Sequence, residues 1–209
     1  MKLGDQVKPI PQAPVEVSKQ ITVKPPTARV FFALWPSAEL ADQLGQIARD
    51  AAAQFGGRAT RMDSIHLTLA FMGNVPEARL PELLAAAAGI SADAFTLSID
   101  RLNFWGHNHL LWAGCAAPAT QLAELVAALR EALSTAGFKT GRAGGEFSPH
   151  VSLVRRVPPG AVSSADCPLP IGELLWPCSR FVLIRSQLTA TGSNYGIIGE
   201  FPLSGVSLG

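Results

Sequence analysis

Hydrophobic and polar residues follow two patterns along the chain, one typical of strands and the other of helices. Short apolar or alternating runs predict strands, and apolar residues three or four positions apart predict amphipathic helices. Because both kinds of segment occur throughout the sequence, we expect a fold that contains both helices and strands. The expected strands cover residues 29–35, 65–71, 95–102, 110–115, 149–154, 180–189 and 195–203, and the expected helices cover 37–55, 77–88 and 120–136.

The order strand, helix and histidine-containing strand occurs twice. In the first copy, 31 residues separate Trp35, at the end of the opening strand, from His66. In the second copy, 35 residues separate Cys115 from His150. We interpret this repeat as an internal duplication, on the basis of the order of elements and not of sequence identity.

Each histidine-containing strand carries an imidazole and a hydroxyl two residues apart. These are His66 with Thr68, and His150 with Ser152. Residues i and i+2 of a strand project from the same face, so each imidazole should lie beside its hydroxyl while the intervening residues face the core. One such pair is common on a half-exposed sheet, but two pairs at equivalent places in a repeated unit indicate a functional site.

Two imidazoles and two hydroxyls fit the hydrolysis of a phosphodiester. The ordinary pKa of histidine, near 6.5, allows one ring to accept a proton from water while the other donates one to a leaving oxygen. The hydroxyls can donate hydrogen bonds to the phosphate oxygens. Asp63 is the only acid close to either histidine in the sequence, and its odd spacing from His66 predicts that it points away. We therefore expect no metal and no cofactor.

Composition and charge narrow the class of protein. Of the 209 residues, 48% are apolar and 16% are charged, which excludes a disordered chain, and this length fits one compact domain or two small lobes. The net charge of +1 leaves no broad basic surface for duplex nucleic acid, so contact should be local. Residues 1–26 hold four of the five lysines, together with five prolines, and we expect a flexible extension there. The alternative is a basic arm that binds RNA.

Cysteine content and hydropathy bear on the compartment. Three scattered cysteines form neither a disulfide framework nor a Cys-x-x-Cys motif, which fits a reducing compartment. No apolar run of about 18 residues is present, and the N-terminus has no apolar signal segment. We expect a cytoplasmic protein without membrane contact and, given its modest charge, a monomer.

Taken together, the motifs resemble those of the 2H phosphoesterase superfamily, in particular its RNA 2′,3′-cyclic phosphodiesterases, once called 2′-5′ RNA ligases. The resemblance extends from about Arg29 to Leu203. It implies an α+β fold of two pseudo-symmetric lobes with antiparallel sheets and flanking helices around a central cleft, as one bilobal domain over residues 27–209. The residues that carry it are the run Arg-Val-Phe-Phe-Ala-Leu at 29–34, segments 66–73 and 147–155, and the later Ser186, Gly192 and Tyr195.

The resemblance also implies a role for each motif residue. His66 matches the general acid that protonates the departing 3′ oxygen, and His150 matches the general base that activates water. The product would be a 2′-phosphomonoester. Thr68 and Ser152 match the hydroxyls that hold the phosphate, and serine in place of threonine keeps the hydrogen-bond donor.

Three further residues of the resemblance lie near the second motif. Arg155 matches a basic residue that binds phosphate, although strict alternation puts it on the face opposite His150 unless the strand bends or ends there. Phe147 is expected either to stack on the base or ribose or to pack in the core. Arg142 is a candidate to replace a basic residue that the family often has nearer the second histidine.

Other interpretations of the sequence stay open. The expected partners are RNA 3′ ends or 2′,3′-cyclic nucleotides, with tRNA among the candidates, and ligation of 2′-5′ ends is a further activity to consider. A module that binds RNA ends or tRNA without turnover is one alternative. A metal-dependent hydrolase that uses His107 and His109 is another, although a polar hairpin tip explains this pair more simply. Arg58, Arg61 and Arg156 fit a solvated face better than a substrate rim, and the tryptophans are expected to be core or lobe contacts.

Overall fold

The computed structural model describes residues 25–117, 120–140, 147–163, 165, 167–190 and 192–204. The expected extension falls almost entirely on residues 1–24, and Arg142 falls within 141–146, so both lie outside the described residues. The helices are α1 (Ala38–Phe55), α2 (Leu80–Ala88) and α3 (Thr120–Thr135). The strands are β1 (Thr27–Leu34), β2 (Arg58–Ala59), β3 (Leu67–Pro76), β4 (Phe95–Trp105), β5 (Leu110–Gly114), β6 (Val151–Arg155), β7 (Leu169–Cys178), β8 (Arg180–Thr189) and β9 (Gly192–Pro202).

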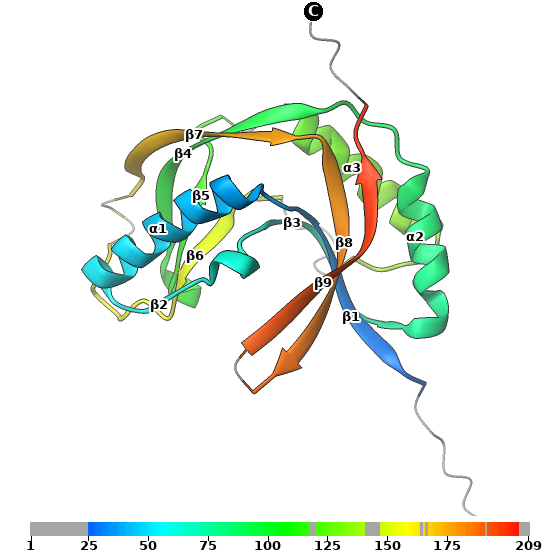
Figure 1. Ribbon diagram of the computed structural model, residues 1–209, viewed down its shortest axis with the longest axis horizontal. Coiled ribbons are helices and arrows are strands. Elements are labelled where there is room, and N and C mark those ends of the chain that lie inside the picture. Colours follow the sequence, from blue (N-terminus) through cyan, green and yellow to red (C-terminus); the bar gives the residue numbers. More distant parts are fainter. Residues whose placement is uncertain are drawn as a thin grey trace, which may run out of the picture.

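The strands form one antiparallel sheet with helices packed against it (Figure 1). The strand order is β7-β4-β5-β6-β3-β1-β8-β9, and β2 lies beside β6. Two halves of four strands meet where β3 pairs with β6 through the single residue pair Leu67–Val151. The expected α+β fold is confirmed, with the two lobes present as two halves of a continuous sheet.

A pseudo-twofold relation at this junction matches the repeat in the sequence. The order β1–α1–β3 in one half corresponds to β5–α3–β6 in the other, and each half places its histidine-containing strand at the junction. Each of these two helices packs against the histidine strand of the other half: α1 lies against β6, and α3 lies against β3. Figure 1 shows α1 on one side of the molecule and α2 with α3 on the other.

The N-terminus of α1 begins as the sequence predicts. The Ser37 side chain accepts a hydrogen bond from the backbone N–H of Leu40, at 3.3 Å, and so caps the helix. Leu40, Leu44 and Ala48 recur at helical spacing and are buried. No helix in the described residues is long and apolar enough to cross a membrane.

Strand β1 is buried on both faces, which explains its unbroken apolar run. Val30, Phe32 and Leu34 belong to the main core that spans both halves of the sheet. Phe31 and Ala33 face the other way and form a smaller apolar cluster with residues of β8. This smaller cluster supports the functional site described below.

Two strands and several strand ends differ from the prediction. The short strand β2 and the strand β7 were not expected; β7 contains Pro170 and Pro177, which an edge strand tolerates because its free side makes no ladder hydrogen bonds. Gly73 was expected to end β3, yet the strand continues to Pro76. A register shift near Val30 and a φ of +69° at Gly73 mark a bulge at this point instead of a stop.

Candidate active site

The two motif histidines have the same local environment. His66 immediately precedes β3 and His150 immediately precedes β6. The Nδ1 atom of His66 lies 2.8 Å from the carbonyl oxygen of Ser64, and the Nδ1 atom of His150 lies 2.8 Å from that of Ser148. A carbonyl oxygen can only accept, so Nδ1 donates in both pairs. Each ring is thereby oriented, and its Nε2 remains available for proton transfer.

The sheet register brings the two motifs together across the junction. Because Leu67 pairs with Val151 in antiparallel register, continuing the register places His66 beside Ser152 and His150 beside Thr68. The histidines are then diagonal neighbours on one face, an arrangement with a separation of about 7–8 Å between Cα atoms. A proton donor and a proton acceptor at this separation can serve one phosphorus between them.

A bulge follows each motif and changes which residues share its face. In β6, Ser152 pairs with Trp112 and Val154 with Leu111, so Leu153 is the extra residue. An extra residue inverts the alternation of side chains beyond it. Arg155 therefore joins the face of His150, which supplies the bend that its predicted role required.

A bulge of the same kind occurs in β3. Thr68 pairs with Ala33 and Ala70 with Phe32, so Leu69 is the extra residue there. Phe71 consequently takes the place in β3 that Arg155 takes in β6. Both Phe71 and Arg155 line the cavity at the junction, which shows that the two bulges have equivalent effects.

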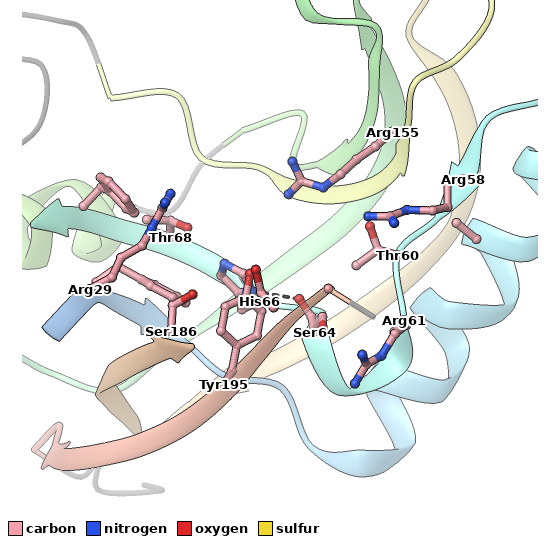
Figure 2. A pocket seen from close by; sticks show the side chains of 15 residues that line it. Arg29, Arg58, Thr60, Arg61, Ser64, His66, Thr68, Arg155, Ser186 and Tyr195 are labelled. Carbon is pink, nitrogen blue, oxygen red and sulfur yellow. Dashed lines mark hydrogen bonds between the residues drawn. The ribbon is translucent and has the colours of Figure 1, made fainter. Parts of the chain in front are cut away.

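This cavity has a volume of about 630 Å³ and is open to solvent (Figure 2). It includes His66, Thr68 and Arg155 among the predicted site residues, whereas His150 and Ser152 are not part of its lining. Both halves of the sheet contribute to the wall. The remaining lining residues are Arg29, Phe31, Arg58, Ala59, Thr60, Arg61, Ser64, Phe71, Ser186, Gly192, Ser193 and Tyr195.

Aromatic side chains enclose both imidazoles. Trp35 stacks on His66 with an interplanar angle of 3° and ring centroids 5.6 Å apart, and Tyr195 meets the same ring edge-on at 5.5 Å. The ring centroid of Trp105 lies 4.6 Å from that of His150. The expectation that Trp35 and Trp105 are only core or lobe contacts is therefore incomplete, because they also form the walls around the histidines.

This enclosure changes the acidity of both rings. Burial, with smaller contributions from the nearby charges of Arg155 and His150, lowers the pKa of His66 to about 4, against the opposing hydrogen bond to Ser64. Burial followed by Arg155 also lowers the pKa of His150. Both rings are consequently neutral at pH 7 without a ligand, and an anion beside Arg155 would favour protonation.

Comparisons with known proteins agree with this geometry. The LigT like Phosphoesterase family model matches residues 34–112. An RNA 2′,3′-cyclic phosphodiesterase of Escherichia coli K12 is 29% identical over 177 residues, which cover 84% of this chain and 97% of the relative. One from Thermus thermophilus is 27% identical over 184 residues, or 85% and 91% of the two chains. These matches support the 2H phosphoesterase family that the sequence motifs suggest.

Solved structures support the same assignment. The structure of E. coli LigT complexed with 3′-AMP matches with a TM-score of 0.76 at 26% identity, over 85% of this chain and 99% of that one. A crystal structure described as a phosphoesterase matches with a TM-score of 0.75 at 28% identity, over 86% and 99%. The expected 2H phosphoesterase fold is confirmed.

Two residues that the sequence analysis considered lie outside the cavity lining. Phe147 is not brought to the cavity lining; it packs against the main core, and the guanidinium of Arg130 lies 5.9 Å from its ring centroid. Asp63 lies in a 3₁₀ turn and not in the strand, where it pairs with Arg61. The guanidinium of Arg61 holds the pKa of the Asp63 carboxyl below its usual range.

The pair His107 and His109 lies at the tip between β4 and β5, as the hairpin interpretation predicts. Among the described residues, no group of three or more histidine, cysteine, aspartate or glutamate side chains is placed to hold a metal ion. The sequence interpretation placed Arg58 and Arg61 on a solvated face, but both line the cavity. Arg58 reaches the cavity because it lies in β2. A strand of two residues is too short to leave a periodic pattern, so the sequence carries no signal for it.

Proposed function

We propose that this enzyme hydrolyses 2′,3′-cyclic phosphodiesters, at RNA 3′ ends or in small cyclic nucleotides, to 2′-phosphomonoesters. The observation that carries the proposal is the pair of identically oriented histidines at the junction of the two sheet halves, each beside a hydroxyl. The relatives that match most of the chain are named RNA 2′,3′-cyclic phosphodiesterases, which supports hydrolysis over binding without turnover.

The proposed reaction is an in-line displacement at phosphorus. The Nε2 atom of neutral His150 accepts a proton from water as the water oxygen forms its bond to phosphorus. The bond between phosphorus and the 3′ oxygen breaks, and protonated His66 donates its proton to that oxygen. Thr68 and Ser152 donate hydrogen bonds to the non-bridging oxygens, and Arg155 balances their negative charge. No step uses a metal.

Substrate binding sets the protonation state that this reaction needs. In the free enzyme, Arg155 contributes to the low pKa of His66. A phosphate anion beside Arg155 offsets that positive charge and favours the imidazolium form of His66. The acid is thus formed when the substrate is bound, while His150, as base, must remain neutral.

Finer points belong to the same proposal. RNA 3′ ends, tRNA among them, are the proposed substrates in the cell, and the enzyme acts as a cytoplasmic monomer. Ligation of 2′-5′ ends would be the same displacement with a 5′ hydroxyl in place of water: the bond from the 5′ oxygen to phosphorus forms, the bond to the 3′ oxygen breaks, and His150 and His66 keep their roles as base and acid.

The proposal is tested with an oligonucleotide that ends in a 2′,3′-cyclic phosphate, incubated in EDTA. We expect only the 2′-phosphomonoester, resolved from its 3′ isomer by phosphorus NMR. His66→Ala and His150→Ala should each lower kcat/KM by about 10²–10⁴-fold, whereas His107→Ala, a matched change at the exposed hairpin tip, should not. Tight binding without any product would instead favour the RNA-end binding module, and loss of turnover in EDTA would favour a metal-dependent enzyme.

A further inference from the structure

Two arginines face each other across the strand pair beside the site. Arg58 in β2 and Arg155 in β6 are directly opposed in antiparallel register, and both line the cavity. Like charges directly opposite one another destabilise a sheet. Arg61 nearby is neutralised by Asp63, but within the described chain neither Arg58 nor Arg155 has a carboxylate partner. An anion between them would remove the repulsion.

A hydroxyl in the same part of the cavity lacks a partner. The Oγ1 atom of Thr60 is buried and makes no hydrogen bond, although Thr60 lines the cavity. A buried hydroxyl without a partner is unfavourable, and a ligand oxygen would satisfy it. Figure 2 shows the guanidinium groups of Arg58 and Arg155 directed toward the same region, with the Thr60 hydroxyl beside that of Arg58.

The backbone brings Arg58, Thr60 and Arg155 close together. The N–H of Thr60 donates to the carbonyl oxygen of Leu153 at 2.7 Å, which continues the alignment of β2 along β6. Gly57 has a φ of +93°, and a Cβ atom there would lie 2.9 Å from the carbonyl oxygen of Arg155. The chain can therefore approach β6 this closely only with glycine at position 57. The backbone of all three residues is thus in place before any ligand arrives.

Arg58, Thr60 and Arg155 lie next to the position of the reacting phosphate, but they form a separate set of contacts. Arg155 is close enough to both histidines to lower the pKa of each, and Arg58 lies on the opposite strand from Arg155. Thr68 and Ser152 belong to the histidine motifs, whereas Thr60 belongs to neither. A second phosphate would thus lie beyond Arg155, one step along a chain from the phosphate that reacts.

We propose that Arg58, Thr60 and Arg155 form a second phosphate subsite, which binds the phosphodiester on the 5′ side of the terminal nucleotide. This inference rests on the proposed function. Arg58 and Thr60 are specificity residues for a polynucleotide end, and Arg155 contacts both phosphates. A nucleoside 2′,3′-cyclic phosphate has no second phosphate, so it gains nothing from Arg58 or Thr60.

The test compares two substrates, a nucleoside 2′,3′-cyclic phosphate and a dinucleotide that ends in the same cyclic phosphate. Arg58→Gln should lower kcat/KM for the dinucleotide by about 10-fold, the size of one charged hydrogen bond, and leave the mononucleotide unchanged. Thr60→Val should act in the same direction with a smaller effect. Arg180→Gln, an exposed arginine paired with Glu200, is the matched control and should affect neither substrate.

A neutral linkage isolates the contact itself. Replacing the phosphodiester of the dinucleotide by a methylphosphonate should remove the advantage of the dinucleotide in the wild type and have little effect in Arg58→Gln. For a longer single-stranded substrate, the slope of log kcat/KM against log salt concentration should be shallower by about 0.7 in Arg58→Gln.

Three outcomes would overturn the subsite. An equal loss on both substrates would place Arg58 on the reacting phosphate or in the fold. No loss on either substrate would show that the subsite is not used, and equal sensitivity of wild type and variant to the methylphosphonate would show that Arg58 does not contact the linkage. If the wild type hydrolyses neither substrate, the proposed function itself fails, which is a distinguishable result.

Discussion

The buried His66 should make folding stability depend on pH in a way that a single substitution removes. The unfolded chain binds a proton on His66 near pH 6.5, whereas the folded protein binds one only near pH 4. Below pH 6.5 the unfolded state therefore holds more protons, and the free energy of unfolding falls as the pH decreases. The loss begins near pH 6.5 and is complete below about pH 4.

The size of this effect follows from the two pKa values. At about 1.4 kcal/mol for each tenfold difference in proton affinity, a pKa lowered from 6.5 to about 4 corresponds to a loss of roughly 3 kcal/mol of stability. This is a large part of the 5–15 kcal/mol that typically stabilises a domain, on the order of one to three fifths. Replacing His66 by glutamine, which does not titrate, removes this pH-dependent contribution to the free energy of unfolding while keeping a polar side chain.

The assay is urea unfolding followed by far-UV circular dichroism at constant ionic strength, between pH 7.5 and pH 4. Circular dichroism is preferred because Trp35, stacked on His66, would make fluorescence sensitive to the substitution. His66→Gln should lose roughly 3 kcal/mol less than the wild type over this interval. His107→Gln, an exposed control, should follow the wild type. If His66→Gln and the wild type lose stability in parallel, the imidazole of His66 is not held neutral by burial.

Further predictions concern the residues around the histidines. Arg155→Gln removes a positive charge that lowers the pKa of both rings, so the bell-shaped pH profile of kcat/KM should move to higher pH while its maximum falls; an unshifted profile would place Arg155 away from the rings. Trp35→Ala opens one wall around His66, and NMR titration should show the pKa of His66 rising toward 6.5; a pKa that stays near 4 would refute this role of the stacked ring. Thr68→Val should lower kcat by about 10²-fold through loss of a hydrogen bond to the phosphate, and a change confined to KM would show that this bond forms equally in the ground state.

The paired motifs could be predicted from the sequence because strand periodicity is local. His66 with Thr68 and His150 with Ser152 each share a face through simple alternation. The neighbouring strands, not the motif itself, determine whether the two faces meet, and the Leu67–Val151 pair joins residues 84 positions apart. The repeat in the sequence suggested that the two motif faces meet, but it did not show which residues of the two strands pair.

Arg155 shows where simple alternation fails. The bulge at Leu153 depends on pairing with β5, and the only local signal is that two consecutive residues, Leu153 and Val154, are apolar. Leu69 and Ala70 repeat that signal in β3. The position of Trp35 depends on the pairing of β1 with β3, and that of Arg58 on the pairing of β2 with β6, so no local pattern could assign them to the site.

The central claim is that one histidine from each half acts on the same phosphorus. The most direct measurement is a double-mutant comparison of kcat/KM for a cyclic-phosphate oligonucleotide in EDTA, with His66→Ala, His150→Ala and the double variant. If the two rings act as a unit, each single variant loses nearly as much activity as the double variant. Losses that multiply, or full activity in either single variant, would contradict the claim.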